Sequence, residues 1–276
     1  MKIVWLLVKI LVFILLTVVT QVGGLVFLLA LWLSYFLKKN NIYRRFCFGG
    51  FSIVFTCLYI IISFGLVPLI AKPLGRVPLP INGDSSLKPL NCITFLLNRH
   101  YVTPELKFTI EKIALEVHNQ HPQTIINYLD ANFPFCNGFP LFPHLSHSDG
   151  KKLDLSFLYL DAKTHQITNH SPSFLGYGVC EEPSGKEVNT ALNCEEKGFW
   201  QYSFLSKMVS QDNKNEFLFD ASRNKFLIET IARQKVVSKI FIEPHLKDRL
   251  GLSLAKIKFH GCRAVRHDDH IHLQIR

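Results

Sequence analysis

Two short stretches hold most of the side chains that could bind a metal ion or move a proton. The stretch HLSHSDGKKLD covers residues 144–154, and the stretch HDDHIH covers residues 267–272, close to the end of the chain. His270 and His272 are two residues apart on a predicted strand, so the two imidazoles project from the same face of that strand. Both stretches therefore place imidazoles beside carboxylates.

The first stretch can join the second in one metal site. A loop that bends at Gly150 brings His147 and Asp154 to one point, where one of His270 and His272 completes a His₂Asp set. Catalytic zinc sites use three such protein ligands and leave the fourth position to water, which then loses a proton near neutral pH. The other histidine of the pair can serve as base and then as acid. A solvated histidine cluster remains the alternative, because the chain has 12 histidines.

The region around these stretches mixes predicted helices and strands. Apolar periodicity predicts helices over 104–118 and 224–235 and a strand over 152–161. Shorter helices are also expected over 122–132, 198–210 and 245–252, and strands over 237–244 and 271–275. Thr103 is placed to cap the first helix. Because no strand–helix–strand repeat is present, we expect an α+β fold in which a central, mainly antiparallel sheet carries the zinc site.

Two uncharged apolar stretches precede this region. Residues 10–37 and 46–71 are each long enough for one membrane span, which needs about 20 apolar residues. The first is predicted as one tilted helix, too short for a helical hairpin, and its apolar part is longer than the ~7–15 residues of a signal peptide. Residues 1–72 are therefore predicted to be a two-span membrane anchor in contact with the lipid bilayer. Glycines in both spans permit dimerisation without indicating it, which leaves the oligomeric state open.

The charge distribution predicts sidedness and excludes one class of partner. Basic loops stay in the cytoplasm, so the linker 38–45 places both termini on the periplasmic or extracellular side of a bacterial inner membrane. The formal net charge is +10, but the chain after Arg76 has only two more basic than acidic residues. No basic stripe is left for a nucleic acid.

A Pro-rich segment, 73–91, is predicted to be an extended tether, followed by the folded domain over 92–276. Five cysteines lie outside the spans, and none forms a C-x-x-C pair, which argues against a thiolate zinc site. In an oxidising compartment Cys180 and Cys194 can close a short loop, so we predict a disulfide between them.

The two histidine stretches resemble those of the penicillin-insensitive murein endopeptidases, which are grouped with lysostaphin-type endopeptidases, D-Ala-D-Ala metallopeptidases and the Hedgehog N-terminal domain. The group pattern is H-x(6)-D followed by H-x-H, which is matched here by His147, Asp154, His270 and His272. The stretch SKIFIEPHLKDRLGL (238–252) is also similar to the segment ahead of their second motif. The resemblance covers roughly 140–276, with a poorly matching middle.

The resemblance implies a zinc metallopeptidase with one Zn²⁺ per chain that hydrolyses amide bonds in peptidoglycan stem peptides or cross-links. It implies the zinc ligands His147, Asp154 and His272, with His270 as general base and acid. A histidine also stands three residues before each motif in that family, and here these are His144 and His267, implied to orient the water or stabilise the oxyanion. The chain departs from the family at Pro143 and Lys152, which affects substrate preference more than the metal.

Two alternatives to this enzyme are open. A catalytically silent zinc-binding module for cell-wall binding or signalling would keep the ligands without the reaction. A serine acyltransferase is weakly indicated by S-x-x-K at four places (Ser85, Ser148, Ser222 and Ser253), but neither S-D-N nor K-T-G accompanies them.

Overall fold

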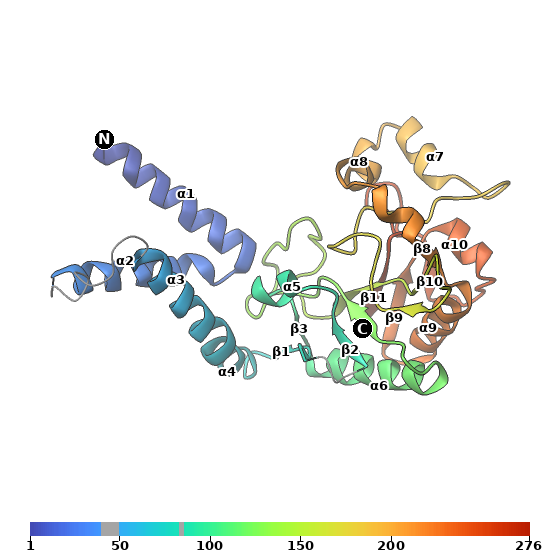
Figure 1. Cartoon of the computed structure of the whole chain (residues 1–276), viewed down its shortest axis with the longest axis horizontal. Coiled ribbons are helices and arrows are strands. Elements are labelled where there is room, and N and C mark those ends of the chain that lie inside the picture. Colours follow the sequence, from blue (N-terminus) through green and yellow to red (C-terminus); the bar gives the residue numbers. More distant parts are fainter. Residues whose placement is uncertain (40–49, 83–85) are drawn as a thin grey trace.

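The computed structural model describes residues 1–39, 50–82 and 86–276. Figure 1 shows apolar helices on one side of a larger domain that contains both helices and strands. Most of the basic linker 38–45, from which sidedness is predicted, lies outside the described residues. The orientation across a membrane therefore stays a prediction.

The N-terminal part is helical. Its elements are α1 (Lys2–Thr20), α2 (Gly23–Lys39), α3 (Gly50–Ile61), the π-helical turn η2 (Ile62–Leu66) and α4 (Val67–Ala71). Two helices, Lys2–Thr20 and Gly50–Ala71, are long and apolar enough to cross a membrane. The single tilted helix predicted over 10–37 is wrong, because the chain turns between α1 and α2, which pack against each other.

The turn between α1 and α2 has a local cause. Gln21 adopts a left-handed conformation with φ 65°, and the Thr20 hydroxyl accepts a hydrogen bond from the Gly23 amide at 2.7 Å. Outside the helices, the Gln21 side chain donates to the Phe135 carbonyl (2.9 Å) and accepts from the Phe135 amide (2.8 Å). Contact with the larger domain therefore stabilises a break that a purely apolar pattern does not predict.

The larger domain is built on a six-stranded sheet with the order β10-β9-β11-β5-β4-β2. Its strands are β2 (Leu87–Pro89), β4 (Ile126–Tyr128), β5 (Lys152–Ser156), β9 (Val237–Phe241), β10 (Ile257–Lys258) and β11 (His270–Ile275). The central pairs β9–β11, β11–β5 and β5–β4 are antiparallel, whereas the outer pairs β10–β9 and β4–β2 are parallel. The predicted combination of helices and strands is confirmed, but the sheet is mixed and not mainly antiparallel as predicted.

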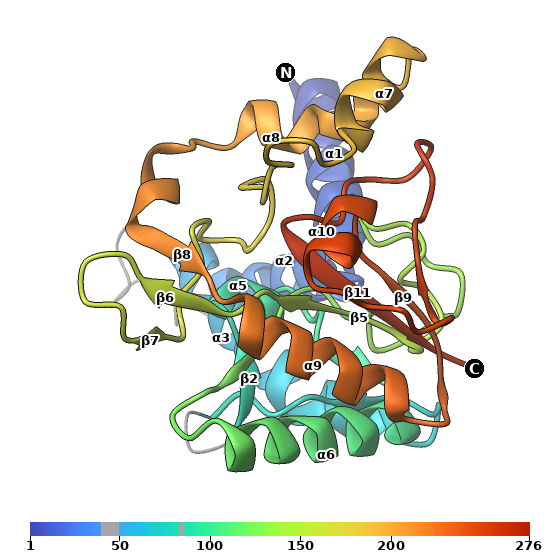
Figure 2. The same cartoon turned by 90° about the vertical axis from the view of Figure 1, so that its right-hand side faces the viewer.

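Two helices, α6 (Pro104–Gln120) and α9 (Ala221–Arg233), cover one face of this sheet. Figure 2 shows both helices lying along the same side of the strands. The Thr103 hydroxyl caps α6 by accepting from the Leu106 amide, as predicted. The core joins the apolar side chains of α6 and α9 to alternate strand residues such as Leu153 and Leu273, which are fully buried.

The remaining elements surround the sheet. They are β1 (Val77–Pro78), α5 (Cys92–Leu96), β3 (Tyr101–Val102), β6 (Tyr159–Asp161), β7 (Ile167–Thr168), α7 (Thr190–Glu196), the 3-10 turn η3 (Trp200–Ser203), α8 (Phe204–Met208), the 3-10 turn η4 (Asp212–Glu216), β8 (Phe217–Phe219) and α10 (Pro244–Arg249). The order β7-β6-β8 forms a small separate sheet. The predicted strand 152–161 is divided between the two sheets, because the Leu158 amide donates to Asn224 Oδ1 rather than to a strand neighbour.

Two further segments differ from expectation. The stretch 122–132, predicted to be helical, contributes β4, which lies between β2 and β5. The segment 73–91, predicted to be a tether, contributes β1 and β2, and its Leu79 and Leu87 are buried in the core. The folded structure therefore extends N-terminal of Cys92.

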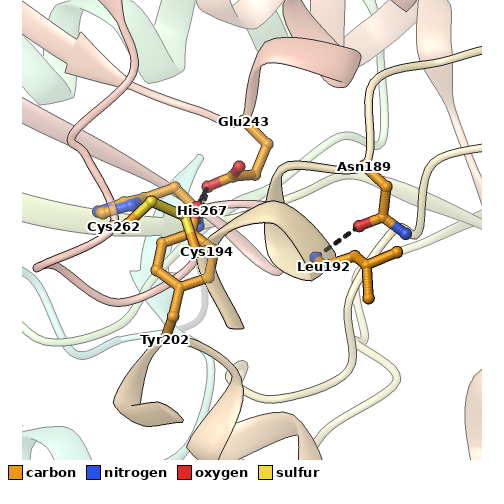
Figure 3. Close-up of a disulfide and its surroundings, with 7 residues drawn as sticks. All are labelled: Asn189, Leu192, Cys194, Tyr202, Glu243, Cys262 and His267. Atoms are coloured by element: carbon orange, nitrogen blue, oxygen red, sulfur yellow. Dashed lines mark hydrogen bonds between the residues drawn. A yellow bond between two sulfur atoms is a disulfide. The ribbon is translucent and has the colours of Figure 1, made fainter. Parts of the chain in front are cut away.

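The disulfide joins Cys194 of α7 to Cys262 in the loop before β11 (Figure 3). The predicted Cys180–Cys194 pairing is wrong. Cys180 is a buried free thiol. The chain next to it is held against the loop before β11, because the Glu181 amide donates to the Asp268 carbonyl at 2.7 Å. The Cys194–Cys262 disulfide links the irregular region 163–203 to the loop that leads into β11, the strand with the H-x-H motif.

Candidate metal centre

The centre of the histidine cluster is Asp154 on β5, which is fully buried. Burial alone would raise the pKa of this carboxyl, but the charges of His147, His270 and His144 outweigh it and hold the pKa well below its usual range. A buried carboxylate is stable only when it is paired, hydrogen-bonded or bound to a metal. Here its two oxygens face two different groups of side chains.

The Oδ1 atom of Asp154 faces two imidazole nitrogens. His272 Nδ1 lies 2.8 Å from it and His147 Nε2 lies 3.3 Å from it, and the two nitrogens are 3.1 Å apart. His147 Nδ1 lies 2.7 Å from the Ala131 carbonyl, which can only accept a hydrogen bond. In the neutral ring the proton is therefore on Nδ1. The lone pair of Nε2 is directed toward Asp154 Oδ1 and His272 Nδ1.

The Oδ2 atom of Asp154 faces a second group. His144 Nδ1 lies 2.8 Å from it, the Tyr177 hydroxyl donates to it at 2.9 Å, and His270 Nε2 lies 3.8 Å from it. His144 Nε2 and His270 Nε2 are both buried without a hydrogen-bond partner. Buried polar atoms of this kind are rare in folded proteins, so both nitrogens are available for a group that binds here.

This arrangement could hold a metal ion. The ligand atoms of His144, His147 and Asp154 all lie within 4.8 Å of one another, and the three residues are buried. His272 adds a fourth donor on the Oδ1 side. The set contains imidazole nitrogens and a carboxylate oxygen only, which suits a first-row divalent metal.

The loop that carries His144 and His147 is held in place by a bend at Gly150. Gly150 has φ 77° and its amide donates to Asn132 Oδ1 at 3.0 Å, which confirms the predicted bend. A Cβ at this position would meet the guanidinium of Arg76. The bend therefore needs glycine both for its backbone conformation and for the close approach of Arg76.

On the strand side, Asp269 holds His270 in place. Its Oδ1 lies 2.5 Å from His270 Nδ1, and its Oδ2 accepts from the Gly178 amide at 2.6 Å. Burial would lower the pKa of His270, but the negative charges of Asp269 and then Asp154 raise it to about 9. His270 is thus a buried imidazole with one nitrogen fixed by a carboxylate and the other directed toward Asp154.

His267 and His260 complete the surroundings. The rings of His267 and His270 lie 4.9 Å apart, and burial with nearby histidine charges lowers the pKa of His267 well below its usual range. The His267 amide donates to Glu243, which also accepts from the Tyr202 hydroxyl (Figure 3). His260 stacks on Phe241 with ring centroids 4.1 Å apart.

All six residues predicted from the sequence lie in this cluster: His144, His147, Asp154, His267, His270 and His272. Sequence reasoning missed Asp269, Tyr177 and His260. Asp269 stands beside His270 in the sequence, so its proximity was visible, but an adjacent residue on a strand normally points to the other face. Asp268 forms a two-pronged ion pair with Arg266.

No protein-family model matches the chain, and no match to it is found among curated proteins. Its likeness to the murein endopeptidases therefore consists of the residues described above. The assignment of a function has to be argued from their geometry.

Proposed function

We propose that the protein is a membrane-anchored, zinc-dependent peptidoglycan endopeptidase. Its substrates are amide bonds in the stem peptides or cross-links of the bacterial cell wall. Its anchor lies in the inner membrane, and its domain faces the periplasm or the cell exterior. The proposal rests on one observation. His147 Nε2 and His272 Nδ1 both lie close to the Oδ1 atom of Asp154.

The donor distances support zinc at this position. A tetrahedral zinc ion with bonds of about 2.0–2.1 Å keeps its ligand atoms roughly 3.3 Å apart. The three pairwise separations among His147 Nε2, His272 Nδ1 and Asp154 Oδ1 are 3.1, 3.3 and 2.8 Å. Ala131 fixes the tautomer of His147 in the form that a metal requires, as outer partners of metal-binding histidines do.

When bound, zinc supplies a Lewis acid that lowers the pKa of a coordinated water to about 7. His270 is the residue that moves the proton. Its Nδ1 is held by Asp269, so its Nε2 takes a proton from the attacking water and gives it to the leaving amine. A divalent cation at Asp154 opposes the rise in the pKa of His270, because like charges disfavour protonation.

His144 and His267 assist from two sides. His144 Nδ1 faces Asp154 Oδ2, which can only accept a hydrogen bond, so in the neutral ring the buried, partnerless Nε2 carries the lone pair. This Nε2 can accept a hydrogen bond from the attacking water and so orient it. His267 contacts the ring of His270 and limits its rotation. The Tyr177 hydroxyl donates to the Oδ2 atom of Asp154 and so holds this carboxylate in place.

The test is digestion of purified peptidoglycan by the full-length protein, with and without a chelator, followed by mass spectrometry of the products. We expect chelator-sensitive release of peptide fragments and about one zinc ion per chain by elemental analysis. His270→Ala should keep zinc and lose hydrolysis by about 10²–10⁴-fold.

His170→Ala, an exposed histidine outside the cluster, is the matched control and should change neither reading. Zinc bound without release of any peptide would favour the silent cell-wall module over the enzyme. A folded protein without metal would reject both.

A further inference from the structure

A basic hollow lies beside the candidate metal centre on the same face of the sheet. Its volume is about 320 Å³, and its lining includes Lys152, Lys239, Lys258, His272 and Gln274. Among the described residues, no acidic side chain lines it. Three lysines from three different strands therefore surround a space that opens onto one of the proposed zinc ligands.

The register of the sheet explains why these residues meet. Gln274 of β11 lies opposite Lys152 of β5 and opposite Lys239 of β9. Residues that face each other across neighbouring strands project to the same side. Lys152, Gln274 and Lys239 thus form a row across the sheet.

The next row contains the metal-binding side chains. His272 lies opposite Asp154 and opposite Phe241, and Lys258 of β10 lies opposite Phe241. Successive rows on one face are two residues apart, which is roughly 7 Å. The lysine row therefore lies about 7 Å from the metal-binding row.

The three lysines are not equally available. Lys152 is largely buried and its ammonium lies 2.5 Å from the Asp149 carboxylate. Lys239 and Lys258 are exposed. These two are the lysines of the hollow that can bind an anion from outside.

The hollow continues past the metal centre. A second cavity of about 240 Å³ shares Ser146, His260 and His272 with the first, and Arg263 lines its far part. These two adjoining cavities, which are together called the groove, both border His272. A peptide in this groove passes the zinc ligands and has a cationic group on either side of them.

We propose that Lys239 and Lys258 bind a free carboxylate of the peptide substrate and so position its amide at the zinc ligands. This inference rests on the proposed endopeptidase function and names the class of peptide it accepts. Because an extended peptide rises about 3.3–3.6 Å per residue, the carboxylate belongs to a residue within about two positions of the cleaved bond. Amidation of that carboxylate removes the charge that the lysines recognise.

The test measures binding separately from hydrolysis. Full-length protein in detergent is titrated into a fluorescently labelled stem tetrapeptide with free carboxylates, and into the same peptide with all carboxylates amidated. Fluorescence anisotropy is read with and without a chelator. We expect the amidated peptide to bind less tightly, and the preference to decrease with added salt.

Lysine variants then locate the site. Lys239→Gln and Lys258→Gln should each weaken binding of the free-carboxylate peptide by up to about fivefold, the range for an exposed ion pair. They should leave binding of the amidated peptide and the zinc content unchanged. Lys112→Gln is the matched control, since Lys112 is exposed on α6, which covers the opposite face.

Equal binding of the two peptides by the unaltered protein would overturn the inference. So would unchanged binding in the Lys239→Gln, Lys258→Gln double variant. A protein that shows the lysine-dependent preference but cleaves no peptide would support the carboxylate site and reject the endopeptidase function. Cleavage without that preference would do the reverse.

Discussion

The two faces of the six-stranded sheet are made by the same strands and have opposite properties. On β11, Ile271, Leu273 and Ile275 enter the apolar core, while His270, His272 and Gln274 face the candidate metal centre and the groove. Asp154 lies between two core leucines on β5 in the same way. Because successive residues of a strand project to opposite faces, residues that stabilise the core alternate with residues that can do chemistry along the same strand.

On the polar face of the sheet, Asp154→Ala should have the largest effect. It removes the carboxylate that both groups of histidines share. We expect zinc content and hydrolysis to fall by more than the roughly 100-fold that loss of an outer partner costs. Elemental analysis and peptidoglycan digestion check this, with the α6 variant Glu111→Gln as control. Retained metal would move the centre away from Asp154.

Leu273→Ala tests the other face. Leu273 directly follows His272 on β11, and its side chain is fully buried in the core. We expect a loss of about 2–5 kcal/mol in the free energy of unfolding, measured by urea denaturation. The folded fraction should keep its zinc. Gln274→Ala, one residue along, should change stability by no more than about 0.5 kcal/mol. If both variants lost metal equally, the two faces would not be independent.

Asp269→Asn tests whether Asp269 acts through His270. The variant keeps the shape of the side chain but removes the charge that holds His270. We expect hydrolysis to slow by about 10–100-fold while zinc content stays the same. The double variant with His270→Ala should be no slower than His270→Ala alone, because both changes act on one imidazole. Additive losses would give Asp269 a separate role.

Glu243→Gln has the smallest expected effect, and it depends on pH. Burial, followed by the negative charge of Asp268, raises the pKa of Glu243 from 4.5 to about 7. Between these values the folded chain holds a proton that the unfolded chain has released, so this residue makes stability fall as pH rises. The variant lacks that dependence. Its urea midpoint relative to the unaltered protein should therefore rise between about pH 5 and about pH 8. An unchanged difference would contradict the raised pKa.

Much of the domain could be predicted from periodicity. The helices around 104–118 and 224–235 and the strands near 237–244 and 271–275 all appear within a few residues of their predicted bounds. In each of these elements, the apolar residues lie on the one face that packs against the core. The stretch 122–132 carries no such clear period, and it forms a strand because β2 and β5 flank it.

The failures share a cause, which is contact between distant parts of the chain. The break at Gln21 depends on Phe135, and the partner of Cys194 is Cys262, 68 residues away. The outer parallel strands that make the sheet mixed come from both ends of the domain. None of these pairings leaves a local signal.

For the candidate site, residue type and spacing located His147, Asp154, His270 and His272, and the family resemblance added His144 and His267. Asp154 and His147 could be placed together because a glycine bend separates them. Tyr177 and His260 could not, since both lie in irregular segments whose path depends on the whole fold.

The reciprocal hydrogen bonds between Gln21 and Phe135 have a mechanical consequence. If the apolar helices lie in a bilayer, these bonds attach the domain firmly to them, in place of a free tether. Phe135 is four residues along the chain from Ala131, whose carbonyl orients His147. The groove then stands at a set height and tilt above the lipid. A peptidoglycan endopeptidase attached in this way would act only on cell-wall strands that pass within that fixed distance of the membrane.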